Sequence, residues 1–346
     1  MRLRAAALLA FAVVLAACSP AKGLHQERLY VFGTLVDVTL WDVTEAQGRA
    51  AVAELARELQ AEHVEWHAWK PGPLVTLNEA IARGEEGRAT PHLARLIEIS
   101  QRLSRESDGL FDPAVGGLVR LWGFHSDDPL TGKAPPSREA IAAWVAQRPT
   151  VGDLRVEGDR VSSRNPAVQL DFGAIAKGYA MDLAVARLRA LGIRNAIVNA
   201  GGGMSAIGQR EDRSWRVGIR HPQGQGVIAA LELGDGEAVH TSGNYERYNE
   251  HEGIRYGHLI DPHTGYPGRE IVSATVIHPD GAVADAAATA LVLAGVKDWE
   301  RIARQMGVKL AMLVDEAGTV HMPPAMAERV HFTNETPPPV KLCASL

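Results

Sequence analysis

The sequence contains only two cysteines, Cys18 and Cys343, in a chain of 346 residues. Two cysteines cannot build the disulfide framework that holds many small secreted domains together. Cys343 lies in the segment TPPPVKLCASL, whose proline content predicts a Pro-rich, disordered tail over residues 331–346. A catalytic cysteine is not expected in such a tail, so the chemistry has to come from other side chains.

The sequence also lacks an excess of positive charge. Its 36 Lys and Arg residues face 41 Asp and Glu residues, which gives a net charge of −5. A nucleic-acid partner is therefore not expected, because a polyanion would be repelled on average. A local basic pocket for a smaller anion is still compatible with this charge. The chain length fits one large domain or two modest ones.

The N-terminal apolar stretch covers only residues 5–17, which is too short to span a bilayer but matches the length of a signal h-region. Two arginines precede this stretch, and LAAC ends it at Cys18. Small residues directly before a cysteine resemble the lipobox of bacterial lipoproteins. We therefore expect a lipoprotein signal peptide over residues 1–17 and lipidation of Cys18, with a plain secretory signal as the alternative.

Lipidation of Cys18 would anchor the mature protein, because more than one acyl chain gives stable membrane attachment. Ser19 follows the cysteine where an Asp could stand, and by the sorting habit of lipoproteins this favours the outer membrane over the inner one. We expect a bacterial membrane lipoprotein that faces the periplasm. Residues 18–27 would then be the lipidated cysteine and a short tether.

The remaining chain mixes helical and strand patterns without a repeat of fixed period. Helices are expected over residues 44–69, 91–109, 136–148, 178–193, 283–295 and 299–307. Strands are expected over residues 28–41 (one strand or a pair), 154–157, 160–163, 167–171, 195–201 and 273–279, with hairpins over 214–233 and 309–323. These patterns predict one compact α+β domain from about residue 28 to 330, with mixed or antiparallel sheets and packed helices.

The stretch LDFGAIAKGYAMD (170–182) places Asp171 at the end of an apolar run and Lys177 in a small-residue turn before a helix. A strand, a glycine-rich turn and a helix N-terminus together favour an anionic ligand, and a lysine adds a point charge for phosphate. The spacing is neither that of a P-loop nor that of a dinucleotide fold. An ordinary strand-to-helix turn is the alternative reading.

Two further regions concentrate polar residues or glycine. NAGGGM (199–204) has three glycines directly after a buried strand, which predicts either close backbone approach or a flexible turn. HTSGNYERY (240–248) and YGHLIDPHTGYP (256–267) follow closely. In the second of these, His258 precedes an apolar pair and an Asp-Pro turn, so we expect it at a strand end beside a loop, where functional side chains are common.

In VADAAATA (283–290), Asp285 and Thr289 are four residues apart and share one face of the expected helix. A carboxylate and a hydroxyl are hard oxygen ligands of the kind that Mg²⁺ binds together with waters and substrate phosphates. The alternative is that Asp285 interacts with the helix dipole while Thr289 is only packed. The spacing alone does not decide between these readings.

Taken in chain order, these motifs resemble the ApbE family of FAD:protein FMN transferases. The matching segments are FGTLVDVTLW, GLFDPAVGGLVRLWGF, DFGAIAKGYAMD, NAGGGM, VGIRHP, TSGNYERY, HLIDPHTGYP and VADAAATAL. The resemblance covers roughly residues 30–325 and implies an ApbE-like domain of the T-fold type. It also implies Mg²⁺-dependent transfer of FMN from FAD to a Thr or Ser hydroxyl of a target protein, with AMP as the leaving group.

Targets of this family carry a D-G-x-T/S-G-A-T-like motif, as in subunits of sodium-pumping quinone reductases and in electron-transfer complexes outside the cytoplasm. Some members of the family instead hydrolyse FAD to FMN and AMP. A flavin-binding lipoprotein with little catalysis is a third possibility, from another functional class. Nothing in the sequence separates the transferase from the hydrolase.

The resemblance also assigns roles to residues. It implies a Mg²⁺ site made by Asp285, Thr289 and the backbone carbonyl of Ala174, and His258 is the candidate general base, with a Mg²⁺-bound water or Asp285 as alternatives. Residues expected to contact FAD are Phe32, Trp69, Asp112, Ala114, Val115, Asp171, Lys177, Leu259 and Ala288. Carboxylates usual in the family are replaced here by Gly203, His221 and Asn244, and Phe32 stands in place of a common methionine.

Overall fold

The computed structural model describes residues 21–126, 133–333 and 336–346. The predicted signal peptide over residues 1–17 and the predicted lipidation of Cys18 lie outside these residues. The helices are α2 Glu45–Trp66, α3 Pro73–Ala82, α4 Pro91–Glu106, α5 Gly116–Leu121, α6 Arg138–Val145, α7 Ala176–Ala190, α8 Gly281–Gln305 and α9 Pro324–Ala327, with a short 3₁₀ helix η1 Val151–Asp153. Within the described part of the chain, no helix has both the length and the apolarity needed to cross a membrane.

The strands alternate with these helices along the chain. They are β1 Gly23–Val31, β2 Thr34–Val43, β3 Gly87–Arg88, β4 Leu154–Glu157, β5 Arg160–Ser163, β6 Asn195–Ala200, β7 Gly203–Ile207, β8 Trp215–Arg220, β9 Val227–Leu233, β10 Ala238–Gly243, β11 Tyr248–His251, β12 Ile254–Gly257, β13 Ile271–His278, β14 Leu310–Asp315, β15 Val320–Met322, β16 His331–Phe332 and β17 Val340–Leu342.

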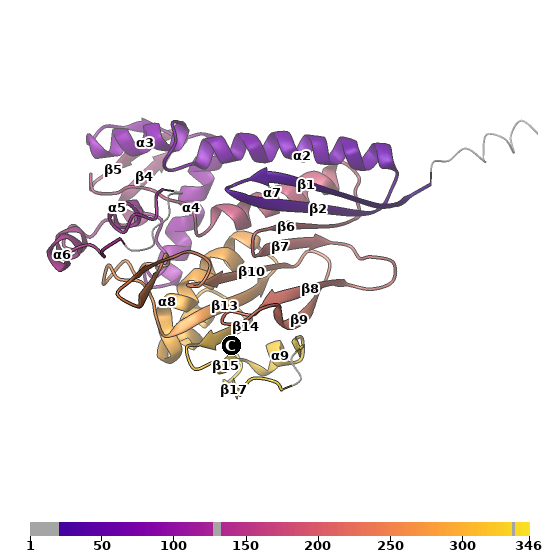
Figure 1. The fold of residues 1–346 in the computed structure, drawn as a ribbon. Helices are drawn as coiled ribbons and strands as arrows, with labels where there is room; N and C mark the ends of the chain where they lie inside the picture. The colour runs from indigo at the N-terminus through magenta and orange to yellow at the C-terminus, as the bar shows by residue number, and fades with distance from the viewer. Residues whose placement is uncertain (1–20, 127–132, 334–335) are drawn as a thin grey trace, which may run out of the picture.

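Nine strands form the main sheet, in the order β1-β2-β6-β7-β10-β13-β14-β15-β17. Figure 1 shows them one after another, from β1 beside α2 to β17 at the opposite end. Neighbouring strands are antiparallel except for β15 and β17, which are parallel. The predicted α+β class with mixed and antiparallel sheets is therefore confirmed.

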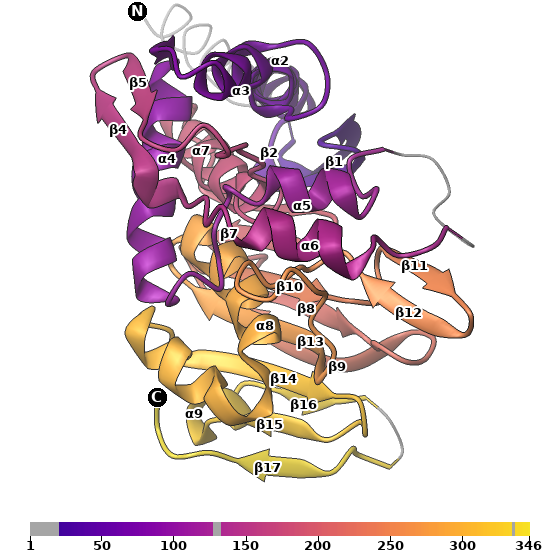
Figure 2. The same ribbon diagram turned by 90° about the vertical axis from the view of Figure 1, so that its left-hand side faces the viewer.

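The main sheet separates two cores. On one face, α2, α4, α7 and α8 pack over β2, β6 and β13, and on the other face the small sheet β16-β9-β8 covers β7, β10 and β14. Strand β14 shows the alternation, since Ala311 and Leu313 enter the helical core whereas Met312 and Val314 enter the other. A third, smaller core joins α5, α6 and β12 (Figure 2).

Helix α8 is central to the site because almost all of its first half is buried. The stretch from Gly281 to Val292 is rich in alanine, and alanine lets the sheet and α7 approach the helix closely. The two helices predicted over residues 283–295 and 299–307 correspond to the two parts of α8, which are separated by the non-helical backbone of Gly295, where φ is 69°.

The predicted tether over residues 18–27 is wrong for its last part. Strand β1 begins at Gly23, and His25 is buried, with only 6% of its surface exposed. The imidazole of His25 lies against Gly48 of α2, so this segment is fixed between the sheet and a helix. The domain therefore starts before residue 28.

The strand predicted over residues 167–171 is also wrong. Only an isolated bridge between Val115 and Gln169 forms there. The segment is held instead by the buried Asn78, whose amide donates to the Leu170 carbonyl and accepts the Leu170 N–H, at 2.9 and 2.8 Å. A side chain thus takes the place of a strand neighbour.

The tail predicted to be disordered over residues 331–346 contains two strands in its described part. His331–Phe332 pairs with β9, and Val340–Leu342 pairs with β15. Both β9 and β15 offer an edge with unpaired backbone groups, and Pro339 can supply its carbonyl to the Val320 N–H without needing a donor of its own. Proline content alone was therefore a poor guide to disorder here.

Candidate functional site

Helices α7 and α8 touch where two glycines meet. A Cβ atom on Gly178 would collide with the backbone carbonyl of Gly281 and would lie 2.8 Å from the Cβ of Asp285. Glycine at 178 therefore permits the crossing, and the crossing brings Asp285 to the first turn of α7. The sequence pattern predicted both helices, whereas their contact is a finding of the structure.

The Asp285 carboxylate caps α7 from the neighbouring helix. Its Oδ2 accepts the N–H of Gly178 at 3.0 Å. The residue at the N-cap of α7, Ile175, has no side-chain oxygen to offer, so the free amide in this first turn is satisfied by α8 instead. The positive end of the helix dipole also favours a carboxylate at this position.

Asp285 is held in its ionised form. Burial opposes the charge, because only 4% of the residue is exposed, but the Lys177 ammonium, His240 and the Gly178 amide more than offset this. Together they keep the pKa of Asp285 well below its usual range. His240 approaches from the sheet, with Nδ1 3.6 Å from Asp285 Oδ1.

Thr289 and Ala174 are the other two residues that the resemblance assigns to the metal. Thr289 lies one turn beyond Asp285, and its Oγ1 is 3.1 Å from Ser242 Oγ. Ala174 directly precedes Ile175, the N-cap residue of α7, so it lies in the turn that leads into this helix.

This donor set suits a hard cation. In the part of the chain that the structure describes, no three His, Cys, Asp or Glu side chains group together as a metal site. A metal would therefore rest on one carboxylate, one hydroxyl and one carbonyl oxygen. Mg²⁺ fits such a set, because it takes few protein ligands and completes its octahedron with waters and phosphate oxygens.

Asp171 organises the turn before α7. Its Oδ1 accepts the Gly173 N–H at 2.8 Å, and its Oδ2 accepts the indole N–H of Trp69 at 2.9 Å. Both carboxylate oxygens are thus used inside the protein, and one of these bonds fixes the orientation of Trp69. The Lys177 ammonium donates to the Gly173 carbonyl at 3.1 Å, which ties the lysine to the same turn.

The Lys177 charge acts on several groups at once. It stabilises the ionised forms of Asp285 and Glu246 and disfavours the protonated form of His258. Glu246 was not singled out from the sequence. Its Oε1 lies close to Gly202, 3.5 Å from the position that a Cβ atom on this glycine would take. Burial nevertheless raises the pKa of Glu246, because it outweighs the pull of Lys177.

The indole of Trp69 has two cationic or aromatic neighbours that sequence reasoning missed. The His125 ring lies 5.4 Å from it, and the Arg120 guanidinium lies 5.4 Å from its centroid. Both belong to, or directly follow, the segment GLFDPAVGGLVRLWGF, which the resemblance had already marked. Basic residues within that segment were the available signal for this cluster.

His258 lies just after β12, as predicted, and its imidazole has a defined tautomer. The backbone carbonyl of Arg247 accepts the backbone N–H of His258 at 3.0 Å, and the same oxygen lies 3.1 Å from the ring nitrogen Nδ1 of His258. A carbonyl oxygen only accepts, so Nδ1 carries the proton and Nε2 keeps its lone pair. Burial, together with the Lys177 and Arg247 charges, lowers the pKa of His258 to about 4, so the ring is neutral at pH 7.

Other residues predicted to contact FAD have roles inside the fold. Phe32 stacks on Trp66 with ring centroids 6.0 Å apart, within an aromatic cluster on α2. The Asp112 carboxylate accepts hydrogen bonds from Ser104 Oγ, Ala114 N, Thr150 Oγ1 and Val151 N. Asp112 therefore joins three segments of the chain, and a contact with FAD stays a prediction for both residues.

The apolar members of the predicted set are mostly enclosed. Ala114 and Ala288 have no exposed surface in this conformation, and Leu259 is 7% exposed. Val115 is partly exposed and bridges to Gln169, which sets its segment beside Asp171. Ala114 and Ala288 are thus fully buried in this structure, and a contact of either residue with FAD stays a prediction.

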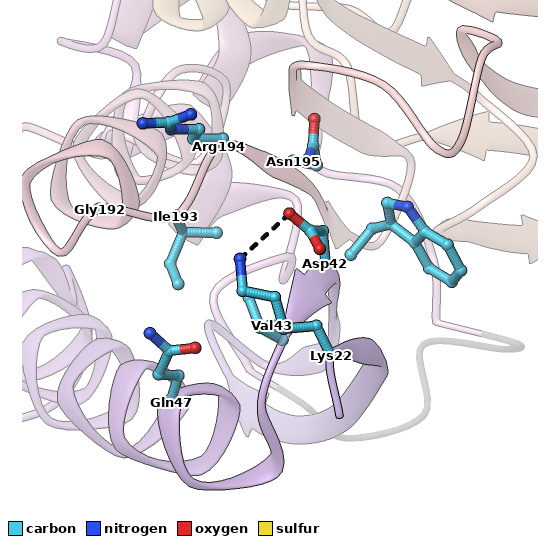
Figure 3. Close-up of a pocket in the computed structure, with 9 residues that line it drawn as sticks. Lys22, Asp42, Val43, Gln47, Gly192, Ile193, Arg194 and Asn195 are labelled. Atoms are coloured by element: carbon cyan, nitrogen blue, oxygen red, sulfur yellow. Dashed lines mark hydrogen bonds and ion pairs between the residues drawn. The ribbon is translucent and has the colours of Figure 1, made fainter. Parts of the chain in front are cut away.

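Two cavities in the described residues are lined by other side chains. Figure 3 shows the first, of about 250 Å³, where Lys22 pairs with Asp42 at 3.3 Å. The second, of about 380 Å³, is lined by residues that include Tyr179 and Asp182. Neither of these two cavities is lined by a predicted site residue.

This fold and this cluster define a single α+β domain with an ionised carboxylate at a helix N-terminus, beside a lysine and hard oxygen donors. Residues 32–313 match the ApbE family. The chain therefore belongs to the ApbE family.

Curated relatives of the chain carry one name. A FAD:protein FMN transferase of Rhodobacter capsulatus is 49% identical over 304 residues, which is 88% of this chain and 58% of the relative. A second protein of that name, from Klebsiella pneumoniae, is 31% identical over 327 residues and covers 90% of this chain and 92% of the relative. This chain thus spans little more than half of the first relative but nearly all of the second.

Solved structures agree with this assignment. The ApbE protein of Thermotoga maritima has a TM-score of 0.80 at 29% identity and covers 90% of this chain and 100% of its own. The apo flavinyl transferase ApbE of Pseudomonas stutzeri has a TM-score of 0.77 at 29% identity and covers 91% and 98%. The predicted single ApbE-like domain is confirmed by this similarity.

Proposed function

We propose that this protein transfers FMN from FAD to a Thr or Ser hydroxyl of an acceptor protein and releases AMP. The observation that carries this proposal is the ionised Asp285 at the N-terminus of α7, next to Lys177. A fixed negative charge beside a lysine and free helix amides suits a cation and a phosphate bound together. The names of the relatives support the same reaction.

Mg²⁺ would be held by Asp285, Thr289 and the carbonyl of Ala174. When bound, it supplies neutralisation of the negative charge on the pyrophosphate. The protein's own contribution is to keep Asp285 ionised and in place through the Gly178 amide and Lys177. Lys177 can also reach a phosphate oxygen with its ammonium group.

His258 is proposed as the group that accepts the proton. Its Nε2 has a free lone pair, because Nδ1–H is directed at the Arg247 carbonyl. The acceptor hydroxyl oxygen forms a bond to the FMN phosphorus, the bond from that phosphorus to the AMP oxygen breaks, and the hydroxyl proton moves to His258. Asp285 is less suited to this role, because its pKa is held well below its usual range.

Trp69 is proposed to lie against a flat ring of FAD. Its orientation is fixed by the bond to Asp171, and an aromatic face suits a heterocycle.

The acceptor would carry a D-G-x-T/S-G-A-T-like motif, as in quinone reductase or electron-transfer subunits. Water in place of the hydroxyl would make the protein a FAD pyrophosphatase, and a flavin-binding lipoprotein without turnover is the third reading.

One experiment separates these three readings. Residues 19–346 are incubated with FAD, Mg²⁺ and a domain carrying the acceptor motif, while AMP and the intact mass of the acceptor are followed together. AMP with an added FMN mass on the acceptor is the expected result. AMP with free FMN and an unmodified acceptor would support hydrolysis, and tight FAD binding without AMP would support the binding protein.

We also propose that lipidation of Cys18 anchors the protein to a membrane facing the periplasm. The support is the LAAC sequence before a polar segment that leads into β1. The variant Cys18→Ser is expected to appear in the soluble fraction, without an acyl mass. Continued membrane attachment of this variant would contradict the anchor.

A further inference from the structure

His240 and Gly203 lie side by side on two adjacent strands of the main sheet. They are direct cross-strand partners in the pairing of β10 with β7. A Cβ atom on Gly203 would collide with Cε1 and Nδ1 of the His240 ring and would lie 2.9 Å from its Nε2. Only glycine leaves room for the imidazole, so the two positions form a matched pair of one large and one absent side chain.

The same imidazole reaches the candidate metal ligand. His240 is 1% exposed, and its Nδ1 lies 3.6 Å from Asp285 Oδ1. The other oxygen of that carboxylate accepts the Gly178 amide. The carboxylate is thus approached by α7 on one oxygen and by the sheet on the other.

The buried position of the His240 imidazole leaves one of its ring nitrogens without a hydrogen bond in the described part of the chain. Its Nε2 is buried and has no hydrogen-bond partner within the described residues. An unsatisfied buried polar atom destabilises a fold, so its retention in a native structure needs an explanation. A purely structural role would be filled better by an apolar side chain of the same volume.

We propose that His240 is a positioning residue for Asp285, and that Gly203 is present to admit its ring. The terminal torsion of an aspartate is broad, and the Gly178 amide fixes only one oxygen. Contact with the imidazole restricts the second, and so directs the carboxylate toward Thr289 and the Ala174 carbonyl. The inference rests on the proposed function, because Asp285 is the metal ligand only there.

The positioning role is tested by titrating Mg²⁺ alone into the parent protein and two variants. His240→Leu keeps most of the volume but loses the nitrogen, whereas His240→Asn retains an N–H near the place of Nδ1. We expect Mg²⁺ affinity to fall about tenfold in the Leu variant, in line with a lost polar contact, and to stay within about threefold in the Asn variant. Parent affinity in the Leu variant, or equal loss in both, would overturn the role.

The pairing with Gly203 is tested separately, by thermal unfolding without metal. His240→Ala should lower Tm in the parent because it leaves a cavity. In the Gly203→Ala background the same change should raise Tm, because it removes the collision. Equal lowering in both backgrounds would overturn the pairing. A parent chain that binds no Mg²⁺ would overturn the metal assignment and the positioning role with it, while the Tm comparison still decides the pairing.

Discussion

Two buried carboxylates in this protein respond to burial in opposite ways. Asp285 on α8 is 4% exposed and Glu62 on α2 is 8% exposed. The pKa of Asp285 is held well below its usual range, whereas burial, together with the charges of Glu58 and Glu65, raises the pKa of Glu62 to about 8. Burial alone therefore does not determine which of these carboxylates is ionised.

The difference comes from the neighbours. Asp285 faces a lysine, an imidazole and a helix amide, whereas Glu62 faces two other glutamates, and its Oε2 has no hydrogen-bond partner within the described residues. The first environment maintains a charge that a cation can use, and the second favours a neutral acid. A perturbed carboxylate marks a functional site only when specific partners produce the perturbation.

The largest expected effect comes from removing the Asp285 charge while keeping its shape. Asp285→Asn can still accept the Gly178 amide, but it is neutral. We expect AMP release from FAD to fall at least about 100-fold, the size typical of losing one preorganised electrostatic group. Asp298→Asn, on a half-exposed residue of the same helix, is the matched control and should keep parent activity. Parent-level AMP release in Asp285→Asn would contradict a catalytic role for the Asp285 charge and would leave no functional difference between Asp285 and Glu62.

A smaller effect is expected from Lys177→Gln, which removes the cation that distinguishes the Asp285 environment from that of Glu62. The pKa of Asp285 should rise, and kcat/KM for FAD should fall about 10- to 100-fold, the range of a charge-assisted contact to phosphate. Lys297→Gln, at an exposed position on α8, serves as the control. Unchanged kinetics in Lys177→Gln would contradict a phosphate contact for Lys177.

The smallest expected effect concerns stability and tests the second carboxylate of the comparison, Glu62. The folded pKa of Glu62, about 8, lies above its ordinary value of 4.5, so its contribution to stability is complete below pH 4.5 and is lost as the pH rises toward 8. Glu62→Gln should therefore be more stable than the parent at pH 8, by about 1–3 kcal/mol, and nearly equal to it at pH 5.

Urea unfolding at both pH values measures this difference. Glu98→Gln, an exposed glutamate on α4, is the control and should show no comparable dependence on pH. A stability difference between Glu62→Gln and the parent that is the same at pH 5 and pH 8 would show that Glu62 is ionised like an ordinary surface glutamate.

The sequence predicted those parts of the fold that local patterns encode. The helices predicted over residues 44–69 and 136–148 form as α2 and α6, and the structure shows that the side chains of Thr44 and Ser137 cap their first turns. The hairpin β8–β9 and the closing hairpin β14–β15 also follow the predicted ranges. The segments at 167–171 and 331–333 are fixed by partners far away in the sequence, Asn78 and strand β9. Residues 23–27 were missed for another reason, since they pair with the neighbouring strand β2.

The candidate site shows the same division. The spacing of Asp285 and Thr289 was readable because one helix carries both, and His258 was readable from its place beside a turn. His240 was not, since its role depends on the β7–β10 pairing and on the contact of α7 with α8. No local spacing encodes these contacts, and the roles of the individual site residues stay predictions.

The most direct test of this account is a calorimetric titration of Mg²⁺ into the parent protein, Asp285→Asn and Asp298→Asn. The account predicts binding to the parent and to Asp298→Asn with similar affinity, and no measurable binding to Asp285→Asn at the same concentrations. Binding to Asp285→Asn with the parent's affinity would contradict the claim that the ionised carboxylate at the start of α7 is the metal ligand.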